Sequence, residues 1–333
     1  MRAIVIERPG GPEVLVWRDL PSPEPGRGEV RVRVRATAVN RADLLQRMGL
    51  YPPPPDAPQH IPGLEFADEV DVVGAGVVAW KPGDRVFGLV GGGAYAEELV
   101  THGDCLAHIP ERLSFTDAAA IPEAFITAWD AMVTQGRLCA GETVLVHAVG
   151  SGVGTAAVQI ARALSARALG TARTAAKLGR AGRLGMDRGF AVGAATDGAG
   201  PRFADDVLRA TEGRGVDVVL DLVGGSYVAE DIQCAARGGR IIVVGLMAGV
   251  RADIDLARVL HKRLAIRGTV LRSRPLGEKI EVTQAFARHL VPLVATGALL
   301  PVVERVLPLG DAAAAHQAMA SNEGFGKLVL RVD

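Results

Sequence analysis

Hydrophobic and polar residues alternate with a period of two in the first part of the chain, most clearly over residues 29–38. This alternation predicts a strand with one buried face. Apolar runs bounded by glycine- and proline-containing turns indicate further strands at residues 2–6, 70–78 and 85–90. Residues 51–55 are a tyrosine followed by prolines, which continue neither a helix nor an inner strand, so we expect a stiff extended loop there. The first 120 or so residues therefore predict a β-rich domain.

A different pattern begins near residue 122, where longer apolar runs alternate with stretches of helical periodicity. Apolar residues recur at helical spacing over residues 155–164, after an apolar run and a glycine-rich turn. Alternation of this kind predicts βαβ units and a parallel sheet whose strands are buried. The expected strands cover residues 143–146, 168–172, 189–192, 216–220, 240–244 and 264–270.

The last part of the chain predicts one long helix over residues 275–296 and a final strand over 326–332. The expected fold class is α/β, with a β-rich domain and a doubly wound parallel-sheet domain. We expect three segments, 1–121, 122–265 and 266–333, of which the last returns to complete the first domain.

Composition and charge exclude several classes of function. The chain has 333 residues, 49% of them hydrophobic, which is enough for two domains with cores of their own. Lys+Arg and Asp+Glu both number 37, so no basic field exists to attract nucleic acid. Charges or glycines interrupt every apolar run before the roughly 18 residues of a membrane span. Three scattered cysteines favour neither a disulfide framework nor a metal knuckle. We expect a cytoplasmic protein that binds neither nucleic acid nor membranes.

The glycine-rich turn at residues 147–154 has the sequence HAVGSGVG. Its small residues let the backbone approach an anion, and the first amides and the dipole of the following helix point at that anion. Val149 and Ser151 occupy two positions where the strict three-glycine fingerprint has glycine, so a tight structural turn is the alternative interpretation. The segment predicts a cradle for the pyrophosphate of a dinucleotide.

The end of the next expected strand indicates which dinucleotide is bound. It lies about 20 residues beyond the glycines, where a site that prefers NAD places a carboxylate for the ribose hydroxyls. Here the chain has Ala172, Arg173 and Thr174, with Lys177 one turn later. Cations and hydroxyl groups suit a 2′-phosphate, which a carboxylate would repel. We expect NADPH rather than NADH; the alternative is that Arg173 and Lys177 are solvated charges at a helix start.

Several runs of residues resemble one protein family, in the family's order and over essentially the whole chain. The runs cover residues 40–47, 49–54, 63–67, 121–125, 127–129, 245–247 and 271–274. In these runs the chain resembles the zinc-free quinone oxidoreductases of the ζ-crystallin type, which belong to the medium-chain dehydrogenase/reductase superfamily. The similarity is closest to the tumour-suppressor-inducible quinone reductase branch. It implies a GroES-like catalytic domain (1–121, completed by 266–333) and a Rossmann domain that binds NADPH (122–265).

Departures from the zinc-using members of that superfamily bear on metal binding. The positions where those members have zinc ligands carry Asn40, Leu64 and Glu123 here. Without a thiolate or an imidazole these residues make a poor zinc site. The cysteine-rich lobe that holds a structural zinc is also missing, since residues 91–100 contain no cysteine. We therefore expect no metal ion.

The resemblance also implies which residues contact the cofactor. The pyrophosphate would lie on the amides of residues 151–153, and the 2′-phosphate near Arg173 and Lys177. A tyrosine that helps to hold this phosphate in the similar branch is Val192 here, which bears on the strength of the NADPH preference. The expected cofactor-binding residues are Tyr51, Thr127, His147, Ser151, Gly152, Val153, Thr171, Arg173, Lys177, Gly245, Leu246, Met247 and Asn322.

A quinone that accepts hydride develops negative charge on its oxygen, and nearby hydrogen-bond donors stabilise that charge. The candidate catalytic donors are the hydroxyl of Tyr51 and the amide of Asn40. The alternatives are a packing role for Tyr51 and a role in a turn or strand end for Asn40. No dedicated acid–base residue is evident, so water is the expected proton source.

The leading hypothesis is an NADPH-dependent quinone reductase that needs no metal and acts on an aromatic ortho-quinone. One alternative keeps the fold and reduces the alkene of an enoyl or alkenal substrate. A second alternative is a non-catalytic protein that binds NADPH. The resemblance implies a homodimer formed through the edge strand at residues 264–270, with a tetramer as the other assembly. The sequence does not decide between hydride transfer and single-electron chemistry.

Overall fold

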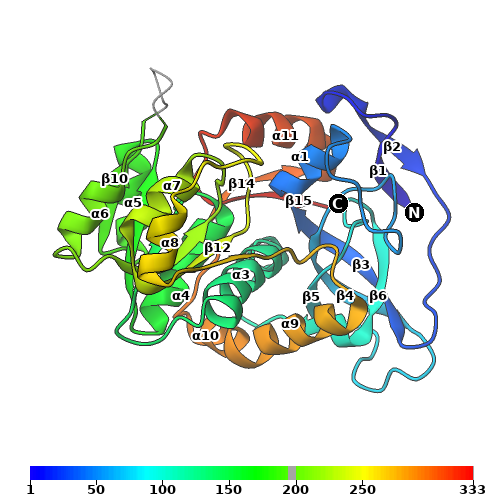
Figure 1. Ribbon diagram of the computed structural model, residues 1–333. Helices are drawn as coiled ribbons and strands as arrows, with labels where there is room; N and C mark the ends of the chain where they lie inside the picture. The colour runs from blue at the N-terminus through cyan, green and yellow to red at the C-terminus, as the bar shows by residue number, and fades with distance from the viewer. Residues whose placement is uncertain (194–199, 333) are drawn as a thin grey trace. The chain divides into compact units, whose positions relative to one another are not determined.

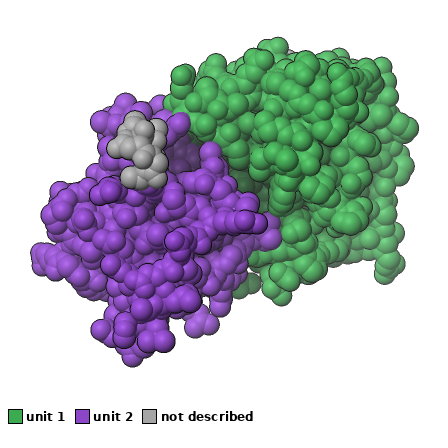
Figure 2. All heavy atoms as spheres, turned by 45° about the horizontal axis from the view of Figure 1, so that its top comes forward, with its two compact units in different colours: residues 1–126, 271–333 green, residues 127–270 purple. Residues whose placement is uncertain are grey.

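The structure, a computed structural model, describes residues 1–193 and 200–332. The chain divides into two units, which Figure 2 colours separately: residues 1–126 with 271–333 form unit 1, and residues 127–270 form unit 2. The boundaries follow residues 126 and 270, where the sequence led us to expect 121 and 265. No helix of the described residues combines the length and the hydropathy that a membrane crossing requires.

Unit 2 contains a six-stranded parallel sheet in the order β10-β9-β8-β11-β12-β13. Figure 1 labels β10 and β12 of this sheet. Its strands are β8 (Thr143–Val146), β9 (Arg167–Ala172), β10 (Arg188–Ala191), β11 (Val216–Asp221), β12 (Ala235–Val243) and β13 (Ala265–Gly268). The connecting helices are α4 (Gly152–Ala163), α5 (Ala175–Arg183), α6 (Ala204–Ala210), α7 (Tyr227–Cys234) and α8 (Leu256–Lys262). This is the strand order of a doubly wound nucleotide-binding fold, whose topological switch point lies between β8 and β11. The structure confirms the predicted parallel sheet.

The central strands of unit 2 are apolar because both faces of the sheet are covered. Every residue of β8 and β11 is buried, and Leu145, Val219 and Ile241 are 0% exposed. Burial on both faces explains why these strands read as continuous apolar runs in the sequence instead of alternating.

Unit 1 is built on a mixed sheet in the order β14-β15-β3-β4-β5-β7, with β6 paired to β3, and on the separate hairpin β1-β2. The strands are β1 (Arg2–Ile6), β2 (Leu15–Asp19), β3 (Glu29–Ala38), β4 (Glu65–Val73), β5 (Arg85–Leu89), β6 (Glu98–His102), β7 (Leu106–His108), β14 (Val303–Pro308) and β15 (Lys327–Arg331). Strand β15 pairs antiparallel with β3, so the end of the chain does return to the first sheet.

Unit 1 also contains helices and single helical turns. They are α1 (Arg41–Arg47), α2 (Phe115–Ala118), α9 (Leu276–His289), α10 (Val291–Thr296), α11 (Ala312–Ser321) and the single turns η1 (Pro12–Val14), η2 (Gly103–Cys105) and η4 (Leu309–Asp311). Helix α3 (Pro122–Trp129) crosses the unit boundary and continues into η3 (Asp130–Gln135) of unit 2.

Two expected elements differ from the structure. The helix expected over residues 275–296 is two helices, α9 and α10, separated at Leu290. Pro292 explains the break, because its nitrogen carries no hydrogen and its ring clashes with the carbonyl one turn earlier. The strand expected over residues 70–78 ends at Val73. A Cβ on Gly74 would lie 2.1 Å from the carbonyl oxygen of Gly26, so the chain turns there at a close backbone approach.

Candidate functional site

The glycine-rich turn after β8 forms the N-terminus of α4 at the switch point of the unit 2 sheet. Ser151 caps the helix, since its Oγ accepts a hydrogen bond from the amide of Gly154 at 3.0 Å. Among the described residues the amides of Gly152 and Val153 have no acceptor, as is usual for the first positions of a helix. A Cβ on Gly154 would lie 2.5 Å from the carbonyl oxygen of Ala148, so no larger residue fits this turn. The result is a cradle of two available amides at a positive helix end.

Val149 departs from the three-glycine fingerprint, and the structure shows what compensates for it. A Cβ on Gly170 in β9 would lie 2.3 Å from Cγ1 of Val149. The missing side chain at Gly170 therefore makes the room that the Val149 side chain fills. This contact also accounts for the glycine that interrupts the second predicted strand.

Two glycine-containing loops follow β11 and β12 at the same edge of the sheet. A Cβ on Gly224 would lie 2.6 Å from the carbonyl oxygen of Gly245, so the two loops pack backbone to backbone. Oδ1 of Asp221 accepts from the amides of Val223 and Gly224, both at 2.8 Å, which fixes the first loop. In the second loop Leu246 and Met247 are each 55% exposed. Exposed apolar side chains at the carboxyl edge of a parallel sheet suit a ligand with a flat face.

The His147 and Thr171 side chains have hydrogen-bond partners inside the protein, and the expected cofactor contacts of these two residues stay predictions. The His147 ring is 0% exposed, with Nδ1 2.8 Å from Oγ1 of Thr171 and Nε2 2.7 Å from Oδ1 of Asp231. Thr171 is itself buried. Because both ring nitrogens and the threonine hydroxyl have partners inside the protein, we interpret these side chains as structural support for the cradle.

His147, Asp221 and Asp231 form a buried cluster whose nitrogen and oxygen atoms lie within 4.8 Å of one another. Burial alone would lower the pKa of His147, but the Asp231 carboxylate outweighs it and raises that pKa. Burial raises the pKa of Asp231 to about 6. The rings of Phe203 and Tyr227 stand edge-on to His147 at 4.8 and 5.0 Å. The cluster joins β8, β11 and α7 beneath the cradle.

Arg173 and Lys177 lie at the start of α5, directly after β9. Thr174 caps this helix, with its Oγ1 accepting from the amide of Lys177 at 3.4 Å. Arg173 is exposed, whereas Val192 is 3% exposed and belongs to the apolar core of unit 2. Two cations and a hydroxyl therefore stand at the end of the second strand, where an adenosine ribose binds in this fold.

In unit 1 the Asn40 side chain is enclosed by a buried ion pair. Nζ of Lys327 lies 2.6 Å from Oε1 of Glu65 and donates to Oδ1 of Asn40 at 2.5 Å. Nδ2 of Asn40 donates to Oε1 of Glu65 at 2.9 Å and to the carbonyl of Ala38 at 3.2 Å. Both amide hydrogens thus have acceptors inside unit 1, and the expected role of Asn40 as a donor to the substrate stays a prediction. Lys327 also fixes the orientation of the amide, since a flipped amide would point its NH2 group at the ammonium.

Charge balance explains how an ammonium persists in this interior. Lys327 and Glu65 are 4% and 0% exposed. Burial alone would lower the pKa of Lys327, but the charges of Glu65 and Glu123 outweigh it and raise that pKa. The second Glu65 oxygen, Oε2, accepts from the amide of Glu123 at 2.8 Å.

Tyr51 begins the proline loop of unit 1 and is partly buried. Among the described residues its hydroxyl has no hydrogen-bond partner. Burial raises the pKa of Tyr51, so the phenol stays protonated at neutral pH and offers a hydrogen-bond donor. Of the two candidate donors, Tyr51 is the one whose hydrogen remains available.

The last two expected cofactor residues lie on other elements. Thr127 is buried in α3. Asn322 ends α11 in the left-handed conformation with a φ of 57°, and its Oδ1 accepts from Arg41 at 2.5 Å. Their cofactor contacts stay predictions.

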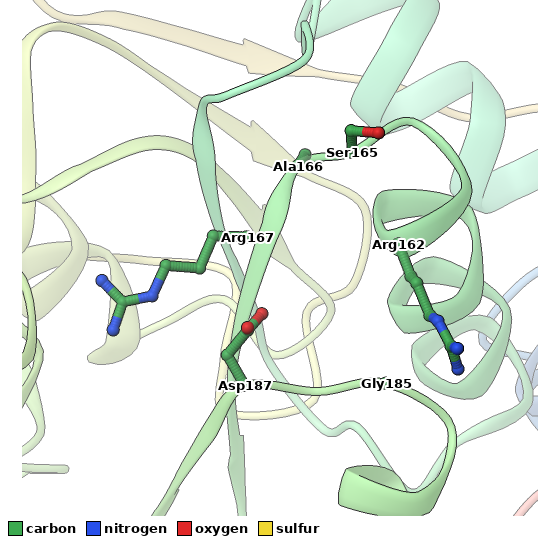
Figure 3. A pocket seen from close by; sticks show the side chains of 6 residues that line it. All are labelled: Arg162, Ser165, Ala166, Arg167, Gly185 and Asp187. Atoms are coloured by element: carbon green, nitrogen blue, oxygen red, sulfur yellow. The ribbon is translucent and has the colours of Figure 1, made fainter.

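A surface hollow of about 500 Å³ in unit 2 lies away from the cradle, at the opposite end of β9. Figure 3 shows Arg162 and Arg167 extending in different directions from it. Asp187, which also lines it, accepts from the amide of Ala168 at 2.7 Å. These residues do not converge on a common point.

Three further residues around the unit 1 candidates were not singled out from the sequence. Glu65, Lys327 and Arg272 are buried ions that contact Asn40 or Tyr51. Glu65 and Arg272 lie within runs that carried the family resemblance. Lys327 was not singled out because it lies in an otherwise apolar strand. A single lysine in such a sequence is normally interpreted as exposed to solvent.

Comparison with known families and proteins matches almost the whole chain. Residues 26–111 match the family described as alcohol dehydrogenase GroES-like domain, and residues 152–288 match zinc-binding dehydrogenase. The quinone oxidoreductase of Lama guanicoe is 34% identical over 341 residues, which cover 99% of this chain and 97% of that protein. A phenolphthiocerol/phthiocerol polyketide synthase protein of Mycobacterium tuberculosis is 34% identical over 327 residues, 98% of this chain but 14% of that much longer protein.

Solved structures agree with these relatives. An NAD-dependent alcohol dehydrogenase is 37% identical with a TM-score of 0.86, and covers 100% of both chains. The Escherichia coli quinone oxidoreductase complexed with NADPH is 29% identical with a TM-score of 0.87, over 99% of this chain and 100% of that one.

Proposed function

Because the chain belongs to the ζ-crystallin-like quinone oxidoreductases of the medium-chain dehydrogenase/reductase superfamily, we propose that this oxidoreductase is an NADPH-dependent quinone reductase. The observation that carries the proposal is the cradle at α4. Its two available amides, at the switch point of a doubly wound sheet, fit the pyrophosphate of a dinucleotide. Gly154 permits the tight turn of the cradle, and Gly224 and Gly245 permit the close packing of the two neighbouring loops.

The preference for NADPH is supported by the charges at the end of β9. Arg173, Thr174 and Lys177 supply two cations and a hydroxyl, and the strand ends in Ala172 where an NAD site has a carboxylate. The E. coli relative carries NADPH, whereas another similar structure is named as NAD-dependent. The local charges of this chain favour the phosphorylated form.

In the proposed reaction the bound cofactor supplies the reducing equivalents, and the protein binds, orients and stabilises charge. The amides of Gly152 and Val153 would hold the pyrophosphate, whereas the amide of Ser151 already donates to the carbonyl of Ala148 at 2.8 Å, so the expected contact of that amide is not available. Leu246 and Met247 would offer an apolar face to the nicotinamide. The Tyr51 hydroxyl donates to the acceptor oxygen as negative charge develops there. Lys327 and Glu65 hold Asn40 in place, and water supplies the final proton.

We propose that this reaction needs no zinc, and the surroundings of Asn40 support this. The positions of possible ligands carry Asn40, Leu64 and Glu123, a set without thiolate or imidazole. The oxygen of Asn40 that could bind a cation already accepts from the Lys327 ammonium. A zinc ion at Asn40 would have to displace that charge.

A second candidate function is the reduction of an activated alkene, which the likeness to a polyketide synthase favours. Both reactions use the same cradle and an electrophilic acceptor. The test is steady-state NADPH oxidation with 1,2-naphthoquinone and with a panel of enones and enoyl thioesters. The proposal expects a kcat/KM for the quinone at least about tenfold above that for each alkene; the reverse order would favour the alkene reductase.

We further propose a homodimer formed through β13. Every residue of this edge strand is exposed, and Leu256 and Leu260 of the preceding helix are 69% and 71% exposed. An unpaired edge beside apolar side chains is a surface that a second copy can extend. Light scattering coupled to size exclusion is expected to give twice the mass of the chain, and Ile266→Pro is expected to give monomers. A wild-type monomer would contradict the dimer.

A further inference from the structure

Arg272 contacts two segments of unit 1 that lie far from it in the sequence, residues 46–51 and the loop at Gly91. The residue is 5% exposed, and its Nε donates to the carbonyl of Gly91 at 2.8 Å. Its terminal nitrogens donate to the carbonyl of Tyr51 at 3.2 Å and to Oε1 of Gln46 at 2.5 Å. The guanidinium carbon also lies 5.2 Å from the centre of the Tyr51 ring. One side chain therefore contacts both the main chain and the ring of Tyr51.

The loops around this contact are packed so that the Tyr51 backbone has little freedom. A Cβ on Gly91 would lie 2.9 Å from Cγ of Pro54, and one on Gly93 would lie 3.0 Å from Cγ of Pro58. The glycines thus permit close approach of the two loops, and each proline fixes its own φ. Tyr51 stands at the open end of this stiff loop, where Arg272 provides the contact to its carbonyl.

We propose that Arg272 is a positioning residue that holds the Tyr51 hydroxyl in its reactive orientation. The inference rests on the proposed role of Tyr51 in quinone reduction and adds a residue to that site. Arg272 acts through Tyr51: its hydrogen bond fixes the carbonyl, and its planar cation lies beside the ring, an arrangement that attracts the ring's π electrons.

Arginine is suited to this role for a geometric reason. The guanidinium is one planar group with several N–H donors. It can donate to three acceptors that lie in different directions and still lie beside an aromatic ring. A lysine has a single nitrogen and cannot reach Gly91, Tyr51 and Gln46 together. The Asp43 carboxylate lies near enough to favour the buried cation, which opposes the cost of its burial.

The first test observes the ring directly and needs no activity. The chain contains three tyrosines, Tyr51, Tyr95 and Tyr227, so 3-fluorotyrosine labelling gives three ¹⁹F signals, and Tyr51→Phe assigns one of them. Arg272→Met is expected to shift or broaden the Tyr51 signal and to leave the other two in place. Arg272→Lys is expected to give an intermediate effect. Arg274→Met is the matched control, because Arg274 lies two residues away and pairs with Glu278.

The second test measures coupling between the two residues. Arg272→Met is expected to lower kcat with 1,2-naphthoquinone by about 10- to 100-fold, because the catalytic hydroxyl is misplaced. The Kd for NADPH is expected to change by less than about threefold. Tyr51→Phe is expected to cost much less in Arg272→Met than in the wild type, because the hydroxyl is already misplaced. Thermal unfolding checks that each variant is folded.

Two results would overturn the proposal: a Tyr51 signal that Arg272→Met leaves unchanged, or an equal kinetic cost of Tyr51→Phe in both backgrounds. If Tyr51→Phe has no kinetic effect even in the wild type, the proposed catalytic role of Tyr51 fails. The ¹⁹F signal still shows in that case whether Arg272 orients the ring.

Discussion

The ammonium of Lys327 lies 2.6 Å from the carboxylate of Glu65 in the interior of unit 1, although the two residues are far apart in the sequence. Strand β15 carries Lys327 to β3, and Glu65 begins β4 on the other side of β3. Through the amide of Asn40 the pair connects the last strand of the chain to the start of α1. Strand pairing thus assembles a polar centre from residues that an isolated segment could not bury.

Removing one partner of this pair is expected to cost more than removing both charges. Lys327→Met leaves Glu65 buried and uncompensated, so we expect the free energy of unfolding to fall by about 3–5 kcal/mol. The double variant with Glu65→Gln is expected to recover part of that loss, because Gln carries no charge and still offers an acceptor. Urea unfolding measures both. Losses that simply add would show that the charges are not coupled.

The contact of Val149 with Gly170 predicts a compensating pair of substitutions. Gly170→Ala places a methyl group 2.3 Å from Cγ1 of Val149, and overpacking of this kind costs about 1–3 kcal/mol. In a Val149→Ala background the same change is expected to cost less, since the closest conflicting atom is gone and only Sδ of Met186, at 2.8 Å, must still move. Urea unfolding of the four proteins checks this. An unchanged cost in that background would mean that the contact with Val149 is not what requires glycine at residue 170.

Loss of the two cations at α5 is expected to weaken NADPH binding selectively. Arg173→Ala with Lys177→Ala should raise the Kd for NADPH by about 10- to 100-fold, as expected for loss of charge-assisted bonds, and leave the Kd for NADH nearly unchanged. Arg180→Ala, in the same helix, is the control for a general change of charge. Fluorescence titration of the wild type and of the double variant with each nucleotide gives the four values of Kd to compare. Equal weakening of both nucleotides would show that these residues do not read the 2′-phosphate.

Acid is expected to destabilise the protein through His316. Burial, together with the Arg47 charge, lowers the pKa of His316 to about 3, and the unfolded value is 6.5. The unfolded chain therefore takes up the proton first, and stability is lost as the pH falls from about 6.5 towards 3. Between pH 7 and pH 5 the free energy of unfolding of the wild type should fall by about 2 kcal/mol relative to His316→Gln.

Asp43 acts in the opposite direction over part of the same range. Burial raises its pKa to about 6 from 3.8, so the folded state binds that proton first and gains stability as the pH falls. The difference between the wild type and His316→Gln isolates the histidine, because Asp43 is present in both. Urea unfolding at several pH values gives that difference, and a constant value would contradict a depressed pKa.

The sequence predicted those features that depend on neighbouring residues. The β8–α4 turn and the period-two strand β3 are local patterns, and both lie where they were predicted. The surroundings of His147 and Asn40 could not be predicted, because a sequence does not show which side chains are buried. The Asn40 amide is occupied by Lys327, 287 residues away, and His147 is enclosed by partners from β9 and α7.

Other differences come from tertiary packing. Val149 departs from the glycine fingerprint, and only the structure shows that Gly170 makes room for its side chain. The break between α9 and α10 follows from Pro292, whose effect on the helix outweighed the apolar periodicity. Arg272 lay in a run that carried the family resemblance, but its role required the positions of Gln46, Tyr51 and Gly91.

The most direct test of the account is the rate of NADPH oxidation with 1,2-naphthoquinone by protein dialysed against a strong chelator. The account predicts saturable turnover that depends on the quinone and equals the rate before dialysis. Absence of quinone-dependent turnover in either sample, or a rate that disappears on chelation and returns with zinc, would contradict it.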